Sequence, residues 1–83
     1  MAPVPPITNC IRRLRFDHGE MTQADLAARV GITRQTVAAI EQNRYSPSLE
    51  AAFRIAEVFS VEITTVFLWK AETKGTQSPE FNS

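Results

Sequence analysis

Apolar residues recur along most of the chain at spacings of three and four residues, which is the period of an amphipathic α-helix. The successive stripes hold Ile11 and Leu14, then Leu26, Ala27 and Val30, then Val37 and Ile40, then Leu49, Ala52, Phe53, Ala56 and Phe59, and last Val66 and Phe67. The breaks between the stripes are short, and no clear strand pattern occurs before residue 61. The pattern therefore predicts an all-α fold of five helices.

Residues that cap helices stand at the expected ends of these stripes. Four helices have a suitable N-cap residue, namely Thr8 or Asn9, Thr22, Thr33 and Ser48. Asp25 follows Thr22 by three residues, so the two form a partial match to a capping box, which usually has Glu or Gln. Gly19, Gly31 and Asn43 tolerate the left-handed backbone that ends a helix.

The two ends of the chain differ in composition from its middle. Three of residues 1–6 are proline, which favours an extended, disordered tail. Residues 72–83 are polar and rich in turn-forming residues, so we expect a second flexible tail there. The ordered domain then spans residues 7–71. Its last helix is expected to begin near Thr64, although residues 66–70 would also suit a short C-terminal strand.

Composition narrows the classes of function. A chain of 83 residues has room for one domain. Nine basic residues balance nine acidic ones, so an anionic partner such as DNA needs a local basic face. With one cysteine and one histidine, a disulfide framework, a zinc site and a convincing catalytic triad are excluded. No apolar run is long enough to span a membrane. We expect a cytoplasmic protein that is not an enzyme and uses no cofactor or metal.

The most informative segment is residues 22–43, where two short helical stripes are joined by a turn at Gly31. Ile32, Val37 and Ile40 fall on the inner side of this pair. The residues left pointing outward near the start of the second helix are Arg34, Gln35, Thr36 and Ala39. This is the pattern of a helix-turn-helix, whose second helix, here residues 34–42, enters the major groove of DNA.

The sequence resembles the Xre family, the Cro and phage-repressor type of helix-turn-helix domain. The matching pieces are residues 22–27 (TQADLA), 30–36 (VGITRQT), 40–45 (IEQNRY) and 47–56 (PSLEAAFRIA), within a match that covers about residues 9–67. The resemblance implies a lambda-repressor-like fold and a sequence-specific DNA-binding transcriptional regulator. Two departures stand out: one extra residue in the loop before Thr22, expected only to lengthen it, and Asn43 where many members have glycine.

The resemblance assigns DNA contacts to positions of this chain. Gln23 would contact a phosphate, although it could also be an ordinary first-turn residue. Arg34 and Gln35 would read bases, since Arg pairs with guanine and Gln with adenine through two bonds each. Arg34 gripping a phosphate is the alternative. Ala39 would meet a thymine methyl group or simply let the backbone approach.

Four further residues are assigned to the DNA backbone, namely Thr33, Thr36, Arg44 and Tyr45. The alternatives are a thymine methyl contact for Thr36 and packing for Tyr45. In this family an arginine of the first helix often pairs with a glutamate at the end of the third. Here those residues are Arg15 and Glu41, and the pair would be structural and partly buried. Arg12 and Arg13 are expected to be solvated surface residues.

A homodimer on double-stranded DNA is the expected assembly, because one recognition helix reads too few bases for a specific site. The operator would be palindromic, with half-sites about 34 Å apart. Residues 61–71 are the expected dimer surface, with Leu68 and Trp69 as anchors, and residues 66–72 of two copies could pair as strands. Repression is the simpler expectation. The alternative is a protein-interaction module, such as an antitoxin-like or regulator-binding partner, with weak or no DNA binding.

Overall fold

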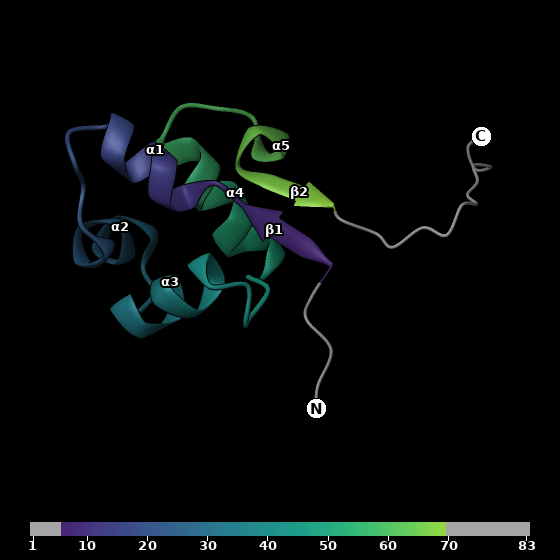
Figure 1. Ribbon diagram of the computed structural model, residues 1–83. Coiled ribbons are helices and arrows are strands. Elements are labelled where there is room, and N and C mark those ends of the chain that lie inside the picture. Colours follow the sequence, from purple (N-terminus) through teal and green to yellow (C-terminus); the bar gives the residue numbers. More distant parts are fainter. Residues whose placement is uncertain (1–5, 70–83) are drawn as a thin grey trace, which may run out of the picture.

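The computed structural model describes residues 6–69, which form five helices and two short strands (Figure 1). In chain order these are β1 (Ile7–Asn9), α1 (Ile11–Asp17), α2 (Gln23–Val30), α3 (Arg34–Glu41), α4 (Leu49–Val58), α5 (Ile63–Val66) and β2 (Phe67–Trp69). The five-helix fold expected from the sequence is confirmed. The expected tails, residues 1–6 and 72–83, lie outside the described residues except for Pro6.

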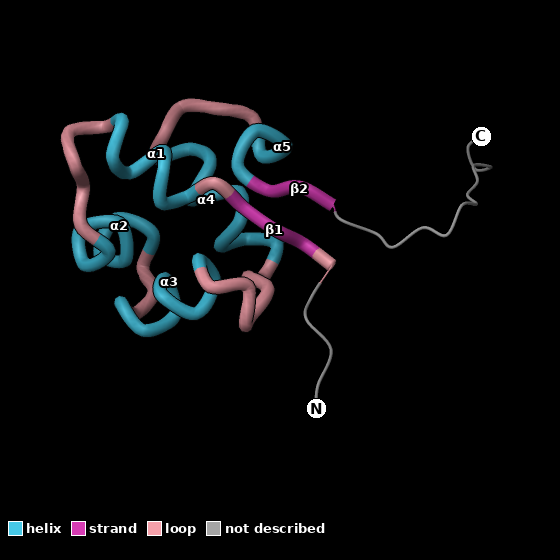
Figure 2. Tube along the Cα trace, viewed as in Figure 1, coloured by secondary structure: helices cyan, strands magenta, loops and turns pink. Residues whose placement is uncertain are grey.

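The strands β1 and β2 pair with each other as a two-stranded antiparallel sheet, so the two ends of the described chain lie side by side (Figure 2). Ile7 stands opposite Trp69 and Asn9 opposite Phe67. The sequence pattern missed β1, because three residues are too few to show alternation and the strand depends on a partner about sixty residues away. Phe67 was expected in the last helix, but α5 spans Ile63–Val66 and Phe67 begins β2.

Asn9 connects β1 to two helices. The N-cap position of α1 is Cys10, not Asn9, but the Asn9 Oδ1 still accepts a hydrogen bond from the Ile11 amide at 3.1 Å. The Asn9 Nδ2 donates to the Ile40 carbonyl at 2.8 Å and to Asn43 Oδ1 at 3.3 Å. One side chain therefore holds the sheet, the start of α1 and the end of α3 together.

A single apolar cluster fills the space between the helices. Its buried members include Ile11, Leu26, Val30, Val37, Ile40, Ile55, Phe59 and Val66. Fully burying a side chain of this kind contributes about 1.5–3 kcal/mol, so the cluster is the main source of stability. The fourth stripe was only partly informative. Leu49 and Phe53 lie one turn apart on an exposed flank of α4, with 72% and 55% exposure, while Ala51 and Ile55 are buried.

The loop between α1 and α2 contains the extra residue noted in the sequence, and it is closely fixed to α1. Gly19 and Glu20 both have positive φ values, +77° and +56°, so the chain turns sharply there. The Met21 amide then donates to the Arg15 carbonyl at 2.9 Å, and Arg15 Nη1 donates to the Met21 carbonyl at 2.8 Å. The longer loop thus delivers Met21 to the core and Thr22 to the start of α2.

Candidate nucleic-acid interface

The helix-turn-helix is set by two N-caps and one left-handed glycine. Thr22 Oγ1 accepts from the Asp25 amide at 3.0 Å, and Asp25 Oδ2 accepts from the Thr22 amide at 3.3 Å, which completes the capping box. Gly31 ends α2 with φ +87°, a conformation that side chains resist. Thr33 Oγ1 accepts from the Thr36 amide at 3.1 Å and starts α3. These local bonds fix where α3 begins relative to α2.

The outer face of α3 carries an open hollow of about 410 Å³, which we call the recognition hollow. Its lining residues are Arg34, Gln35, Ala38, Ala39, Gln42 and Arg44. Arg34 and Gln35 begin the helix and are exposed, whereas Gln42 and Arg44 follow its last turn. Between these polar ends only alanine side chains face the hollow, so a DNA base edge has room to approach the α3 backbone.

Three of the residues predicted to contact bases, Arg34, Gln35 and Ala39, therefore share one hollow. Sequence reasoning did not single out Ala38 or Gln42 as members of this surface. A signal for both was present, because they follow Gln35 by three and seven residues and so fall on the same helical face.

Arg15 and Glu41 form a bidentate ion pair behind this surface. Arg15 Nε donates to Glu41 Oε2 at 2.7 Å, and Arg15 Nη2 donates to Glu41 Oε1 at 3.1 Å. Both side chains are largely removed from solvent, with 15% and 8% of the arginine and glutamate side chains exposed. Two parallel charge-assisted bonds fix orientation as well as distance, so the pair sets α1 against the end of α3.

Gln23, the first residue of α2, lies between the ion pair and Arg34 of α3. Its Nε2 donates to Glu41 Oε1 at 3.0 Å, and its Oε1 accepts from Arg34 Nη1 at a longer 3.5 Å. Gln23 is half-buried, and its amide group is oriented by both neighbours. The structure therefore places Gln23 in a chain of bonds from Arg15 to Arg34 that single-residue sequence reasoning did not foresee.

The residues assigned to the DNA backbone surround the same surface. The hydroxyls of Thr33 and Thr36 share a hydrogen bond of 2.8 Å at the start of α3. Arg44 Nη1 donates to Gln42 Oε1 at 3.1 Å beyond its end. Tyr45 is 51% exposed, so its ring is not a core residue. These side chains bracket the recognition hollow at both ends of α3.

The sheet and α5 carry an apolar groove. These elements lie on the side of the molecule opposite α2 (Figure 1). The groove has a volume of about 180 Å³, and its lining residues are Ile7, Ile63, Thr64, Phe67, Leu68 and Trp69. The two predicted dimer anchors are strongly exposed, Leu68 at 53% and Trp69 at 70%. One edge of β2 pairs with β1 of the same chain, so strand pairing between copies is restricted to the other edge.

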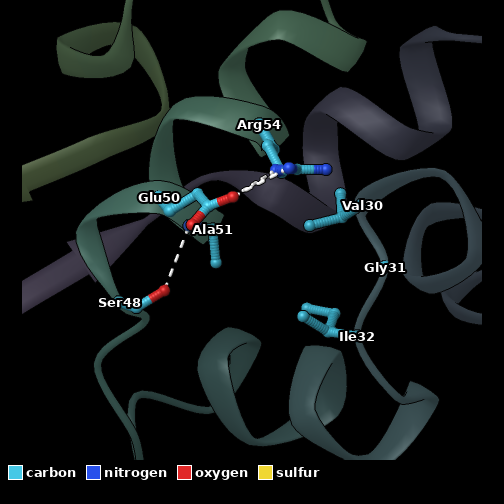
Figure 3. Close-up of a pocket in the computed structure, with 7 residues that line it drawn as sticks. All are labelled: Val30, Gly31, Ile32, Ser48, Glu50, Ala51 and Arg54. Carbon is cyan, nitrogen blue, oxygen red and sulfur yellow. Dashed lines mark hydrogen bonds and ion pairs between the residues drawn. The ribbon is translucent and has the colours of Figure 1, made fainter.

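A further hollow of about 300 Å³ lies between the Gly31 turn and the start of α4 (Figure 3). Its polar side chains are already bonded within the chain. Ser48 Oγ accepts from the Ala51 amide at 3.1 Å, and Arg54 Nη2 donates to Glu50 Oε2 at 2.7 Å. The polar side chains of this hollow therefore take part in a helix cap and an exposed ion pair.

The described residues contain neither a metal cluster nor a membrane-spanning helix. Within residues 6–69, no three His, Cys, Asp or Glu side chains gather closely enough to hold a metal ion. Within the same residues, no helix has the length and apolar character needed to cross a membrane.

Residues 11–66 match the model of a protein family described as "Helix-turn-helix". The match covers more than half of the chain. This chain belongs to the Xre-type helix-turn-helix family. The matched span begins with the first residue of α1 and ends with the last residue of α5. It contains the recognition hollow, the ion pair and Gln23, and it leaves out both strands.

Several members of the family closely resemble this one. An uncharacterized HTH-type transcriptional regulator of Methanothermobacter thermautotrophicus is 51% identical over 59 residues, which is 70% of this chain and 84% of the relative. YgzD of Bacillus subtilis, also named an uncharacterized HTH-type transcriptional regulator, is 45% identical over 77% of this chain and 94% of its own. A Methanocaldococcus jannaschii regulator with the same kind of name is 48% identical over 60% of this chain and 76% of its own.

Family membership and these relatives establish the general function. The protein is a DNA-binding transcriptional regulator of the Xre-type helix-turn-helix family and not an enzyme. The second helix of the helix-turn-helix is α3, which carries the recognition hollow.

Proposed function

We propose that the protein is a homodimeric repressor that binds a palindromic operator with α3 of each protomer in the major groove. The observation that carries the proposal is the recognition hollow, in which two exposed side chains that could read bases, Arg34 and Gln35, adjoin the small side chains of Ala38 and Ala39. A bound dimer would exclude RNA polymerase without further contacts. The activity also supports a cytoplasmic location.

Base reading would come from the first turn of α3. The Arg34 guanidinium would donate two bonds to the O6 and N7 atoms of a guanine, and the Gln35 amide would bond N6 and N7 of an adenine. Each such pair discriminates against a wrong base by about 1–3 kcal/mol. Ala39 would lie against a thymine methyl group. The bond from Gln23 would restrict the directions that Arg34 adopts before DNA arrives.

Backbone contacts would set the register of α3 in the groove. Gln23, Thr33 and Thr36 stand at the start of the two helices, where free backbone amides also favour phosphate. Arg44 and Tyr45 would hold the strand beyond the other end of α3. The paired hydroxyls of Thr33 and Thr36 retain acceptor and donor capacity between them, so capping the helix does not prevent a phosphate contact.

Dimerisation would use the apolar groove of the sheet and α5. Leu68 and Trp69 expose large apolar side chains beside a half-buried Ile63, and exposed aromatic groups of this kind typically anchor interfaces. The groove lies away from α2, so two copies joined there would leave both helix-turn-helix units facing outward (Figure 1). Half-sites about 34 Å apart would then match one turn of the duplex.

Selection of bound duplexes from a random DNA pool tests this proposal. The native protein should enrich a palindrome, and an Arg34→Ala, Gln35→Ala variant with unchanged circular dichroism should not. Enrichment of an asymmetric motif would overturn binding as a dimer to a palindrome, but it would still support sequence-specific DNA binding. No enrichment from folded, dimeric native protein would overturn sequence-specific binding.

The second candidate is protein binding with weak or no DNA binding. The observation that favours it is a partly apolar hollow of about 390 Å³ on α4 and α5. Its lining includes the exposed Phe53 together with Glu57 and Glu62. If the selection fails, this surface is where a partner should first be sought.

A further inference from the structure

A polar recess of about 310 Å³ opens where α1, α2 and α3 meet. Its lining residues are Arg12, Arg15, Gln23, Glu41 and Gln42. Gln42 also lines the recognition hollow, so the recess borders the surface proposed to read DNA. Arg12 and Gln42 had no assigned role, and Arg12 was expected to be a solvated surface residue.

The charges of the recess leave one net positive charge. Both oxygens of Glu41 are engaged by Arg15, and Oε1 also accepts from Gln23, so the charge of the carboxylate is balanced by Arg15. Arg12 has no carboxylate within 4.0 Å among residues 6–69. Its neighbour Arg13 differs, because Arg13 Nε lies 3.7 Å from Asp17 Oδ2.

Several hydrogen-bond donors remain available in the recess. Gln42 Oε1 already accepts from Arg44, so the amide N–H groups of Gln42 are left to donate. Gln23 gives one N–H to Glu41 and keeps a second. The Arg12 guanidinium adds up to five donors and its charge. A site with several donors, one net positive charge and a carboxylate already paired with Arg15 suits an anion with several oxygens.

We propose that this recess binds one phosphate of the DNA backbone, with Arg12 as its cation and Gln42 as a donor from the end of α3. The inference rests on the proposed function, because the phosphate belongs to a duplex whose major groove holds α3. It adds α1 to the DNA interface, and it places Gln42 where the base-reading surface meets the DNA backbone. The bond that Arg44 donates to Gln42 would then couple this phosphate to the one held by Arg44.

The salt dependence of operator binding tests the recess, with Arg12→Ala as the variant and Arg13→Ala as the matched control. Each neutralised phosphate contributes about 0.9 to the slope of log K against log salt. For a dimer, Arg12→Ala should make the slope shallower by about 2 and Arg12→Lys should restore most of it. Arg13→Ala should leave it unchanged. Arg12 and Arg13 are both exposed, so the three variants should fold like the native protein.

A second measurement locates the contact on the DNA. Operator duplexes carrying a single neutral methylphosphonate are titrated in turn with native protein and with Arg12→Ala. A methylphosphonate at one position in each half-site should lower the operator affinity of the native protein several-fold. The same substitution should leave the affinity of Arg12→Ala unchanged. If native protein binds the operator, equal slopes for Arg12→Ala and Arg13→Ala would overturn the proposed phosphate site in the recess. The absence of any DNA position with this pattern would do the same. Native protein that binds no duplex would instead overturn the proposed function.

Discussion

Gln23 and Glu41 share a hydrogen bond of 3.0 Å that joins the first residue of α2 to the last residue of α3. The same Glu41 oxygen accepts from Arg15, and the amide oxygen of Gln23 accepts from Arg34. A residue of the proposed DNA interface is therefore part of the bonding that holds three helices together. Mutations in this network need a stability measurement beside every binding measurement.

Glu41→Ala should behave as a folding defect that looks like a DNA-binding defect. The substitution leaves the Arg15 charge largely buried without its partner, which typically costs about 3–5 kcal/mol. That is a large part of the roughly 5–15 kcal/mol that stabilises a typical domain. Urea unfolding followed by circular dichroism measures the loss. The double variant Arg15→Met, Glu41→Leu should recover much of it, and a loss below about 1 kcal/mol for Glu41→Ala would contradict the structural role.

Trp69→Ala should dissociate the dimer. A large, central aromatic group in an interface commonly carries 2 kcal/mol or more, so the dimer dissociation constant should rise by about thirtyfold or more. Sedimentation equilibrium provides the constant for each variant. Phe16→Ala is the control, because Phe16 is comparably exposed, at 65%, but lies on α1. If the two substitutions raised the dimer dissociation constant equally, the sheet surface would not be the dimer interface.

Asn43→Gly and Asn43→Ala should differ in stability, because residue 43 has a left-handed backbone. Its φ is +59°, which alanine adopts at a cost of about 1–2 kcal/mol and glycine adopts freely. Both substitutions also lose the bond that Asn43 Oδ1 accepts from Asn9. Thermal unfolding should therefore show Asn43→Ala as clearly less stable than Asn43→Gly. Equal stabilities would mean that the left-handed backbone is not retained in the alanine variant.

Operator binding should depend on salt less steeply than binding by a strongly basic repressor. Within residues 6–69, the arginines with no carboxylate inside 4.0 Å are Arg12, Arg29, Arg34 and Arg44. Eight such cations in a dimer, at about 0.9 each, predict a log–log slope no steeper than about −7. Fluorescence anisotropy over a range of salt concentrations gives the slope. A value steeper than about −8 would show that other cations of the chain neutralise phosphates.

Local signals in the sequence were sufficient for most of the fold. The caps at Thr22, Thr33 and Ser48 and the left-handed residues Gly31 and Asn43 act within a few residues, so their positions can be read without knowing the tertiary structure. β1 could not be read, because a three-residue strand exists only through its pairing with β2.

The site shows the same division between local and tertiary information. The exposed face of α3 follows from helical spacing, and a closer use of that spacing would have included Gln42. The recess could not be foreseen, because Arg12, Gln23 and Gln42 come from three elements that meet only in the fold. Leu49 and Phe53 mark another limit, since apolar character does not tell which flank of a helix the core will cover.

The most direct test of the account is the ratio of affinities of the folded native dimer for its selected operator and for a shuffled duplex of equal length, at about 0.15 M salt. Sequence-specific reading by α3 predicts a ratio of about a thousand or more. Arg34→Ala with Gln35→Ala should bring that ratio down by at least about tenfold, since each base pair contact is worth roughly 1–3 kcal/mol. A native ratio within about threefold of unity would contradict the account, because the protein would then hold DNA only through its backbone.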